Sequence, residues 1–365
     1  MILMNDFKAE PEELRQAELN AAERVLKSGW YILGNEVKQF ESAWAERCGV
    51  KHAVGVGNGM DAIEIGLRAL GIGSGDEVIT TSMTAFATVL AILRAGAVPV
   101  LADIDPETAL LNIESVERCL SPRTKAVLLV HLYGQVRDMD AWVDFCASNH
   151  IELLEDCAQS HLASWKGKAA GSFGAWGAYS FYPTKNLGAP GDGGALITQS
   201  DDIANLARSL HNYGQGERYH HPVLGLNSRL DELHAAILSV RLSWLDSFTK
   251  RRREIARAYL KGITNTSVRL LANPLEEQNH VYHLFLILSD ERERLSAFLK
   301  TRGIDNLSHY PIPIHFQPPC KNIRIDPHGL KQAELHASRC LSLPCHPQMD
   351  DEAVKKVIEA VNEFE

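Results

Sequence analysis

Apolar residues follow two alternating patterns along about the first 260 residues of the chain. Short β-like runs predict seven strands, at residues 53–56, 77–80, 98–102, 126–130, 151–155, 175–181 and 195–198. Between them, apolar residues at helical spacing predict helices at residues 61–70, 84–95, 113–120 and 138–150. This alternation is typical of an α/β domain whose sheet is wrapped by helices. Pro99 lies within the third strand and cannot donate a ladder hydrogen bond, so we expect that strand near a sheet edge.

The pattern changes after about residue 262. A long helix is predicted at residues 228–245, because apolar side chains form one stripe along it: Leu230, Leu233, Ala236, Ile237 and Val240. Further along we predict a strand at 281–288, a Pro-rich loop at 309–319, and helices at 291–301, 330–341 and 350–364. These elements indicate a small C-terminal α/β domain at 263–365, after a large domain at 31–262. An amphipathic helix at 10–28 comes first, and we expect this N-terminal segment, residues 1–30, to pack on the small domain.

Composition and charge narrow the class of protein. The 365 residues are 45% hydrophobic and 23% charged, as in an ordinary globular protein. A net charge of −9 argues against nucleic acid as a partner, and no apolar run of about 18 residues predicts a membrane span. The seven cysteines are scattered and lack any C-x-x-C pair, which favours reduced thiols in the cytoplasm over disulfides. No histidine or cysteine cluster has metal-ligand spacing, so we expect no metal.

Two short segments carry the candidate chemistry, residues 155–159 and 180–186. Asp156 ends an apolar run, and an acid at the carboxyl end of such a strand points into the ligand crevice of an α/β sheet. Lys185 follows 29 positions later, among aromatic residues, glycines and prolines. An acid and a lysine held together suit pyridoxal 5'-phosphate (PLP), whose pyridinium the carboxylate keeps protonated while the lysine forms a Schiff base. Taken singly, each residue could equally be a strand-end acid or a loop lysine that never meets the other.

A third segment, residues 57–62, follows a strand and opens a helix. Glycines there let the N–H groups of Gly59 and Met60 close on an anion such as a phosphate, although a turn without a ligand would use similar residues. Ser180 could offer its hydroxyl to the same phosphate, and Gln159 could bond the cofactor from the loop of Asp156.

In their order and in their local sequences these segments resemble the DegT/DnrJ family of PLP-dependent sugar aminotransferases. The resemblance covers essentially the whole chain and extends to residues 28–34, 71–78, 211–214 and 227–232. It implies PLP fold type I, the aspartate-aminotransferase-like α/β fold. In that fold a large domain with a mixed seven-stranded sheet is followed by a small C-terminal α/β domain.

The resemblance also implies roles for individual residues. Lys185 carries the Schiff base, Asp156 meets the pyridine nitrogen and Gln159 lies beside the ring. Ser180 and the amides of Gly59 and Met60 hold the phosphate. Asn227 reaches the phosphate of the neighbouring subunit's cofactor, which implies a homodimer with shared active sites. Relatives commonly cover the ring with an aromatic residue from the stretch 81–87, where this chain has Ala85, so Met83 and Phe86 are both open candidates.

Residues 131–135 and 308–315 are similar to the branch that aminates carbon 3 of a nucleotide-linked 3-keto-6-deoxyhexose, most commonly dTDP-linked, with glutamate as donor. In the second stretch His309, Tyr310 and His315, stiffened by prolines, can bond sugar hydroxyls and diphosphate. We expect a further substrate contact from Tyr31. Three alternatives stay open: a 4-keto nucleotide sugar as substrate, a non-nucleotide substrate such as an inosose, and a non-enzymatic regulatory protein. A related dehydratase would have histidine in place of Lys185.

Overall fold

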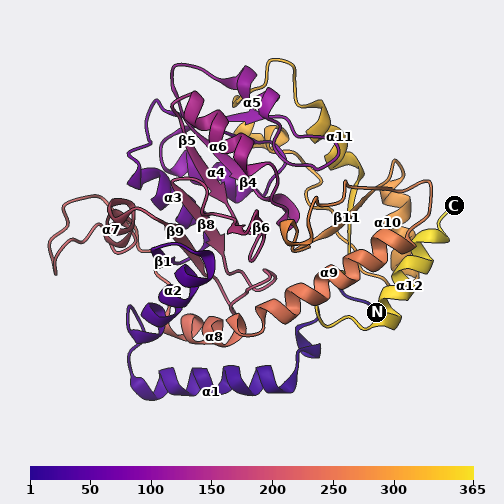
Figure 1. Ribbon diagram of the computed structural model, residues 1–365, viewed down its shortest axis with the longest axis horizontal. Coiled ribbons are helices and arrows are strands. Elements are labelled where there is room, and N and C mark those ends of the chain that lie inside the picture. The colour runs from indigo at the N-terminus through magenta and orange to yellow at the C-terminus, as the bar shows by residue number, and fades with distance from the viewer.

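The computed structural model describes residues 1–365 and has two α/β parts joined by a long helix (Figure 1). The α-helices are α1 (Glu12–Ser28), α2 (Asn35–Cys48), α3 (Gly59–Ala69), α4 (Phe86–Arg94), α5 (Ile113–Cys119), α6 (Met139–Ser148), α7 (Asp201–Leu210), α8 (Glu232–Leu242), α9 (Leu245–Gly262), α10 (Arg292–Thr301), α11 (Lys331–Arg339) and α12 (Asp351–Asn362). The strands are β1 (His52–Val56), β2 (Glu77–Thr81), β3 (Val98–Ala102), β4 (Thr124–Val130), β5 (Glu152–Asp156), β6 (Ser164–Trp165), β7 (Lys168–Ala169), β8 (Trp176–Ser180), β9 (Gly194–Thr198), β10 (Arg269–Leu270), β11 (Phe285–Leu288), β12 (Arg324–Ile325) and β13 (Cys340–Leu343).

The main sheet is mixed, in the order β1-β9-β8-β5-β4-β2-β3-β12. Strand β9 runs antiparallel to both of its neighbours, and the other pairs are parallel. All seven predicted strands are present, but the sheet has eight, so the prediction of seven is wrong by one. The additional strand, β12, comes from the C-terminal part and has two residues, too few to show a period in the sequence. It pairs with β3 only at Val100 and Leu101, so Pro99 next to it needs no hydrogen bond on that side, as expected.

Helices cover both faces of this sheet. Phe40 and Trp44 of α2 pack with Leu238 of α8 on one face. On the other face Ile63 of α3 packs with Trp176 of β8. Both faces of the sheet are therefore covered, and a ligand can reach the sheet only at the ends of its strands. No helix combines the length and the apolar character that crossing a bilayer requires.

The C-terminal part has its own core around the three-stranded sheet β10-β11-β13. Helices α9, α10 and α12 cover it, and Tyr259 of α9 lies inside this core although it precedes the predicted boundary at residue 262. The predicted helix 228–245 is in fact the shorter α8, followed by α9. The predicted helix 330–341 ends at Arg339, where the chain enters β13.

The N-terminal helix α1 packs against α8 of the large part, not on the small domain, so that prediction is wrong (Figure 1). Ala21 and Val25 of α1 meet Ala236 of α8, and Arg241 of α8 pairs with Glu18 at 2.7 Å. Only the residues ahead of the helix reach the small domain, where the N–H of Ile2 donates to the carbonyl of Gly303. The apolar stripe of α1 shows that one face is buried, but not which partner buries it.

Candidate active site

Asp156 is the last residue of β5 and lies at the carboxyl edge of the parallel strands. Its side chain is buried, and its Oδ2 accepts from the hydroxyl of Thr88 at 2.8 Å while Oδ1 accepts from the N–H of Ala158 at 3.1 Å. Burial raises the pKa of this carboxyl, and the two hydrogen bonds and the charge of Lys185 oppose the rise. A cationic partner placed at Asp156 would therefore be strongly favoured.

Lys185 lies in the turn that follows β8, the parallel neighbour of β5. Its N–H donates to the carbonyl of Tyr182 at 2.8 Å, which fixes the turn. Burial lowers the pKa of the amine to about 8, and only the charge of Asp156 opposes this. Asp156 and Lys185 thus share one site, because adjacent parallel strands end at the same edge.

Next to them, the first turn of α3 meets the end of β8. Gly59 opens α3, and a Cβ at this position would lie 2.8 Å from the Cβ of Ser180. The Asn58 side chain caps the N–H of Asp61 at 2.8 Å, whereas the N–H groups of Gly59 and Met60 have no acceptor in the protein. Free N–H groups at a helix N-terminus, beside a serine hydroxyl, fit a phosphate. The acid, the lysine and this cradle together match the chemistry of PLP.

Gln159 connects the loop after β5 to the loop of the small domain. Its Oε1 accepts from the N–H of Tyr133 at 2.6 Å, and its Nε2 donates to the hydroxyl of Tyr310 at 3.2 Å. Burial and the charge of Asp156 raise the pKa of Tyr310 to about 12, so its hydroxyl stays protonated at neutral pH. The structure therefore brings Tyr310 and Gln159 to the site of Asp156.

The two histidines of the same loop have different surroundings. Burial, with the charge of Lys185, lowers the pKa of His309 to about 4, and its Nδ1 bonds Ser342 Oγ at 2.8 Å. His309 is therefore neutral, and the charge of Lys185 acts on its ring. Both ring nitrogens of His315 are engaged, Nδ1 with Ser82 Oγ at 2.9 Å and Nε2 with Glu334 at 3.1 Å. We therefore assign His315 to holding the loop in place, which differs from the substrate contact expected of it.

Tyr31 and Asn227 both have exposed side chains. Tyr31 uses its carbonyl to accept from the N–H of Glu232, and Asn227 forms a backbone bridge with Asn212. No hydrogen bond links either residue to Asp156 or Lys185. The structure of one chain thus leaves both side chains free at the surface.

The two candidates for covering the ring are distinguished by burial. Met83 is fully buried, in a cluster with Met4 and Leu101. A side chain that faces an open ligand site keeps some exposed surface, so Met83 does not fit this role. Phe86, the first residue of α4, is half-buried and remains the candidate.

Thr88 is a site residue that the sequence did not indicate, and Tyr133 lay within the stretch 131–135 but had no role of its own assigned to it. Thr88 is in the first turn of α4, and its hydroxyl bonds that of Thr84, just ahead of the helix, at 2.8 Å. Tyr133 lies in the 3-10 turn Leu132–Gly134 after β4, buried and at a positive φ of 63°. The signal for Thr88 was weak, since a threonine in a predicted helix gives no sign that it will face a strand end.

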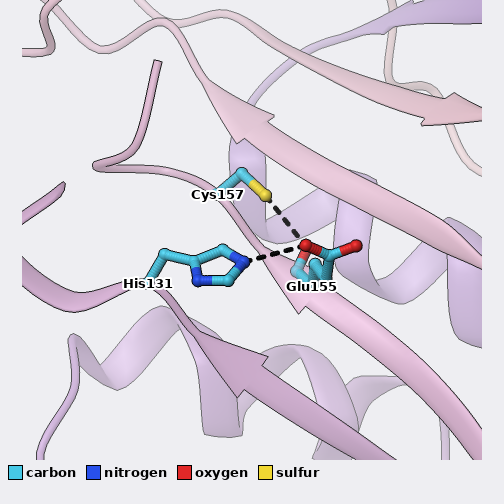
Figure 2. A group of neighbouring side chains, drawn as sticks. All are labelled: His131, Glu155 and Cys157. Atoms are coloured by element: carbon cyan, nitrogen blue, oxygen red, sulfur yellow. Dashed lines mark hydrogen bonds and ion pairs between the residues drawn. The ribbon is translucent and has the colours of Figure 1, made fainter. Parts of the chain in front are cut away.

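Behind the site, His131, Glu155 and Cys157 form a buried cluster (Figure 2). Glu155 accepts from three backbone N–H groups in residues 171–174 at 2.7 to 2.9 Å and meets His131 Nε2 at 2.9 Å. Burial and the neighbouring carboxylates raise the pKa of Cys157 well above its usual range, so it stays a thiol. The oxygens of Glu155 accept these hydrogen bonds, so the cluster holds the loop before β8 in place.

The model of the DegT/DnrJ/EryC1/StrS aminotransferase family matches residues 12–362. The chain is 44% identical over 344 residues to the dTDP-3-amino-3,6-dideoxy-alpha-D-galactopyranose transaminase of Aneurinibacillus thermoaerophilus, covering 94% of both chains. It is 42% identical over 363 residues to the Pleiotropic regulatory protein of Geobacillus stearothermophilus, covering 99% of this chain and 98% of that one.

Among solved structures, S. venezuelae DesV in complex with a ketimine intermediate matches with a TM-score of 0.95 at 42% identity. The match covers 100% of this chain and 97% of that one. The chain belongs to the DegT/DnrJ/EryC1/StrS aminotransferase family. It is an aminotransferase with PLP fold type I, which confirms the predicted family and fold class.

Proposed function

We propose that this aminotransferase binds PLP and moves an amino group from glutamate to carbon 3 of a dTDP-linked 3-keto-6-deoxyhexose. The observation that carries the proposal is the convergence of Asp156, Lys185 and the free N–H groups of Gly59 and Met60 on one site. Lys185 would hold the cofactor covalently, Asp156 its ring nitrogen, and the α3 turn with Ser180 its phosphate. When bound, PLP supplies the electron sink that both half-reactions need.

Lys185 is the residue placed to move protons. Because its pKa is about 8, part of its amine is unprotonated near neutral pH. Its Nζ takes the proton from the α-carbon of the donor in the first half-reaction and supplies the proton that the sugar carbon gains in the second. Asp156 would hold its negative charge for the ring nitrogen of the bound cofactor, and Thr88 and Ala158 fix its two oxygens.

The small-domain loop provides the groups for the sugar substrate. Tyr310 stays protonated and is bonded to Gln159, and His309 is neutral, so both can bond sugar oxygens without adding charge. Phe86 is the side chain we assign to the ring face. The substrate class is supported by the activity named for the Aneurinibacillus relative and by residues 131–135 and 308–315.

We infer further that the active unit is a homodimer. Asn227 is exposed and lies beside a loop whose Tyr213 and Leu224 are 47% and 87% exposed. Such apolar surface fits contact with a second copy, whose cofactor phosphate Asn227 would then reach. The seven free, buried cysteines support a cytoplasmic location, where thiols stay reduced.

The substrate assignment is tested with glutamate and a panel of dTDP- and GDP-linked 3-keto and 4-keto sugars, with an inosose added. Mass spectrometry should show the mass change of amination for the dTDP-linked 3-keto sugar at the fastest rate. Faster amination of a 4-keto sugar or of the inosose would transfer the assignment to that substrate. No amination of any of them, by protein with PLP bound, would favour the regulatory alternative.

A further inference from the structure

Tyr133 lies at the junction of the two parts of the molecule. The turn that carries it is tied to the chain entering β11: the carbonyl of Gly134 accepts from the N–H of Val281 at 3.0 Å. A Cβ at Gly134 would lie 2.7 Å from the Val281 side chain, so the two segments touch closely. We propose that Tyr133 is a positioning residue that sets the His309–Tyr310 segment against the cofactor site. The expected effect on catalysis rests on the proposed function. The claim that Tyr133 fixes the His309–Tyr310 segment does not.

The hydroxyl of Tyr133 holds the backbone of His309. It lies 2.6 Å from the His309 carbonyl oxygen and 2.9 Å from Nε2 of His336 on α11. A hydroxyl has one proton, and the carbonyl can only accept, so Tyr133 donates to His309 and accepts from the Nε2–H of His336. Burial keeps His336 neutral by lowering its pKa to about 4. His336 in turn stacks on the Tyr133 ring, with centroids 5.9 Å apart.

The backbone of Tyr133 holds Tyr310 indirectly, through the side chain of Gln159. The N–H of Tyr133 donates to Gln159 Oε1 at 2.6 Å. This bond orients the Gln159 amide, so that its nitrogen points away from Tyr133. The opposite end, Nε2, donates to the Tyr310 hydroxyl at 3.2 Å. Tyr133 therefore contacts His309 directly and Tyr310 through Gln159, and it is 1% exposed.

The consequence concerns the acceptor substrate. Tyr310 is bonded to Gln159 in the loop that follows Asp156, and the charges of Lys185 and Asp156 act on His309 and Tyr310, so a shift of this dipeptide displaces two groups near the candidate site. Removal of the Tyr133 hydroxyl leaves the His309 carbonyl without its donor and frees the loop to move. The donor half-reaction depends on Lys185 and Asp156, which Tyr133 does not touch. Tyr133→Phe should therefore act mainly on the keto-sugar half-reaction.

The structural claim is tested without any substrate, by hydrogen exchange and mass spectrometry on the full chain with and without PLP. Tyr133→Phe should raise exchange in peptides that cover residues 307–316. The matched control is Tyr179→Phe, because Tyr179 is equally buried and donates to the Ala170 carbonyl at the same 2.6 Å. Equal exchange in residues 307–316 for Tyr133→Phe and Tyr179→Phe would overturn the proposal. If Tyr133→Phe does not fold, His336→Leu provides the comparison, since it removes the group that orients the hydroxyl.

The catalytic claim is tested by a double-mutant cycle on the separated half-reactions. Tyr133→Phe should slow the keto-sugar half-reaction by about tenfold, the usual effect of one buried hydrogen bond, and leave the glutamate half-reaction within about twofold. In a Tyr310→Phe, His309→Ala background the same change should have almost no further effect, because it acts through those residues. Equal slowing of both half-reactions, or full additivity, would overturn the positioning role. Absence of keto-sugar turnover in the wild type would instead refute the proposed function, and hydrogen exchange would still decide the structural claim.

Discussion

The hydroxyl of Thr88 donates to Oδ2 of Asp156 at 2.8 Å, one of two protein hydrogen bonds to this buried carboxylate. Hydrogen bonds to a charged group contribute about 1.5–3 kcal/mol, and this one favours the ionised form that would face a protonated pyridine. Thr88 is therefore part of what prepares Asp156 for the cofactor.

Thr88→Val should weaken PLP binding by about 10- to 100-fold, because the isosteric side chain removes the donor and leaves Asp156 less ionised. Absorbance titration of the cofactor-free protein with PLP measures this. Thr88→Ser is the matched control and should bind nearly as the wild type does. If Thr88→Val and Thr88→Ser bind PLP equally well, the hydroxyl has no part in holding the charge.

Lys185 should be the residue that PLP labels after borohydride reduction, because it shares the site of Asp156 and burial keeps part of its amine unprotonated. Peptide mapping by mass spectrometry locates the label. Lys166 and Lys168 serve as internal controls: they lie nearby in the sequence, and a hydrogen bond to Asp140, together with the charge of that carboxylate, raises the pKa of Lys166. A label on either of them, or on no residue, would contradict the assignment.

The lowered pKa of Lys185 also predicts how the stability of the cofactor-free protein depends on pH. Its folded pKa is about 8, below the usual 10.5, so between these values the unfolded chain binds more protons than the folded one. The free energy of unfolding should therefore gain a contribution that rises with pH from about 8 to 10.5. Denaturant unfolding of wild type and Lys185→Met at several pH values isolates this contribution. A difference between the two that stays constant or falls over this range would contradict the buried lysine.

Sharing of sites between subunits predicts complementation. Neither Asn227→Ala nor Lys185→Ala homodimers should turn over well, because each site would lack one of the two groups. Mixed dimers should recover about one working site, formed by Lys185 of one chain and Asn227 of the other. Turnover is assayed after the two variants are unfolded and refolded together. Recovery no greater than the sum of the parents would indicate that the phosphate is held within a single chain.

The fold was largely predictable because long apolar runs and helical spacing report burial directly. The seven central strands are all where alternation placed them. Strand β12 is too short to show a pattern, and β13 follows α11 without a break, so its apolar residues continue the helical stripe. The partner of α1 was missed for another reason: amphipathicity identifies a buried face, but contact with α8 depends on the tertiary fold.

The site was predictable where the chemistry requires a residue type next to a recognisable element. Asp156 and Lys185 satisfy that condition, and the structure brings them together. Thr88 and Tyr133 do not, because common residues become important only through the group that they meet. His315 was expected to contact the substrate because it is polar and lies in the Pro-rich loop. Nothing in the sequence indicated its bonds to Ser82 and Glu334, which hold the loop in place.

Transfer of nitrogen-15 from labelled glutamate to a dTDP-linked 3-keto-6-deoxyhexose tests the central claim most directly. Mass spectrometry of the product gives the incorporation, and NMR of the isolated sugar gives the carbon that bears the nitrogen. The account predicts one labelled nitrogen, on carbon 3, formed by the wild type with PLP bound and not by Lys185→Ala. Label on carbon 4, no incorporation, or equal incorporation with Lys185→Ala would contradict it.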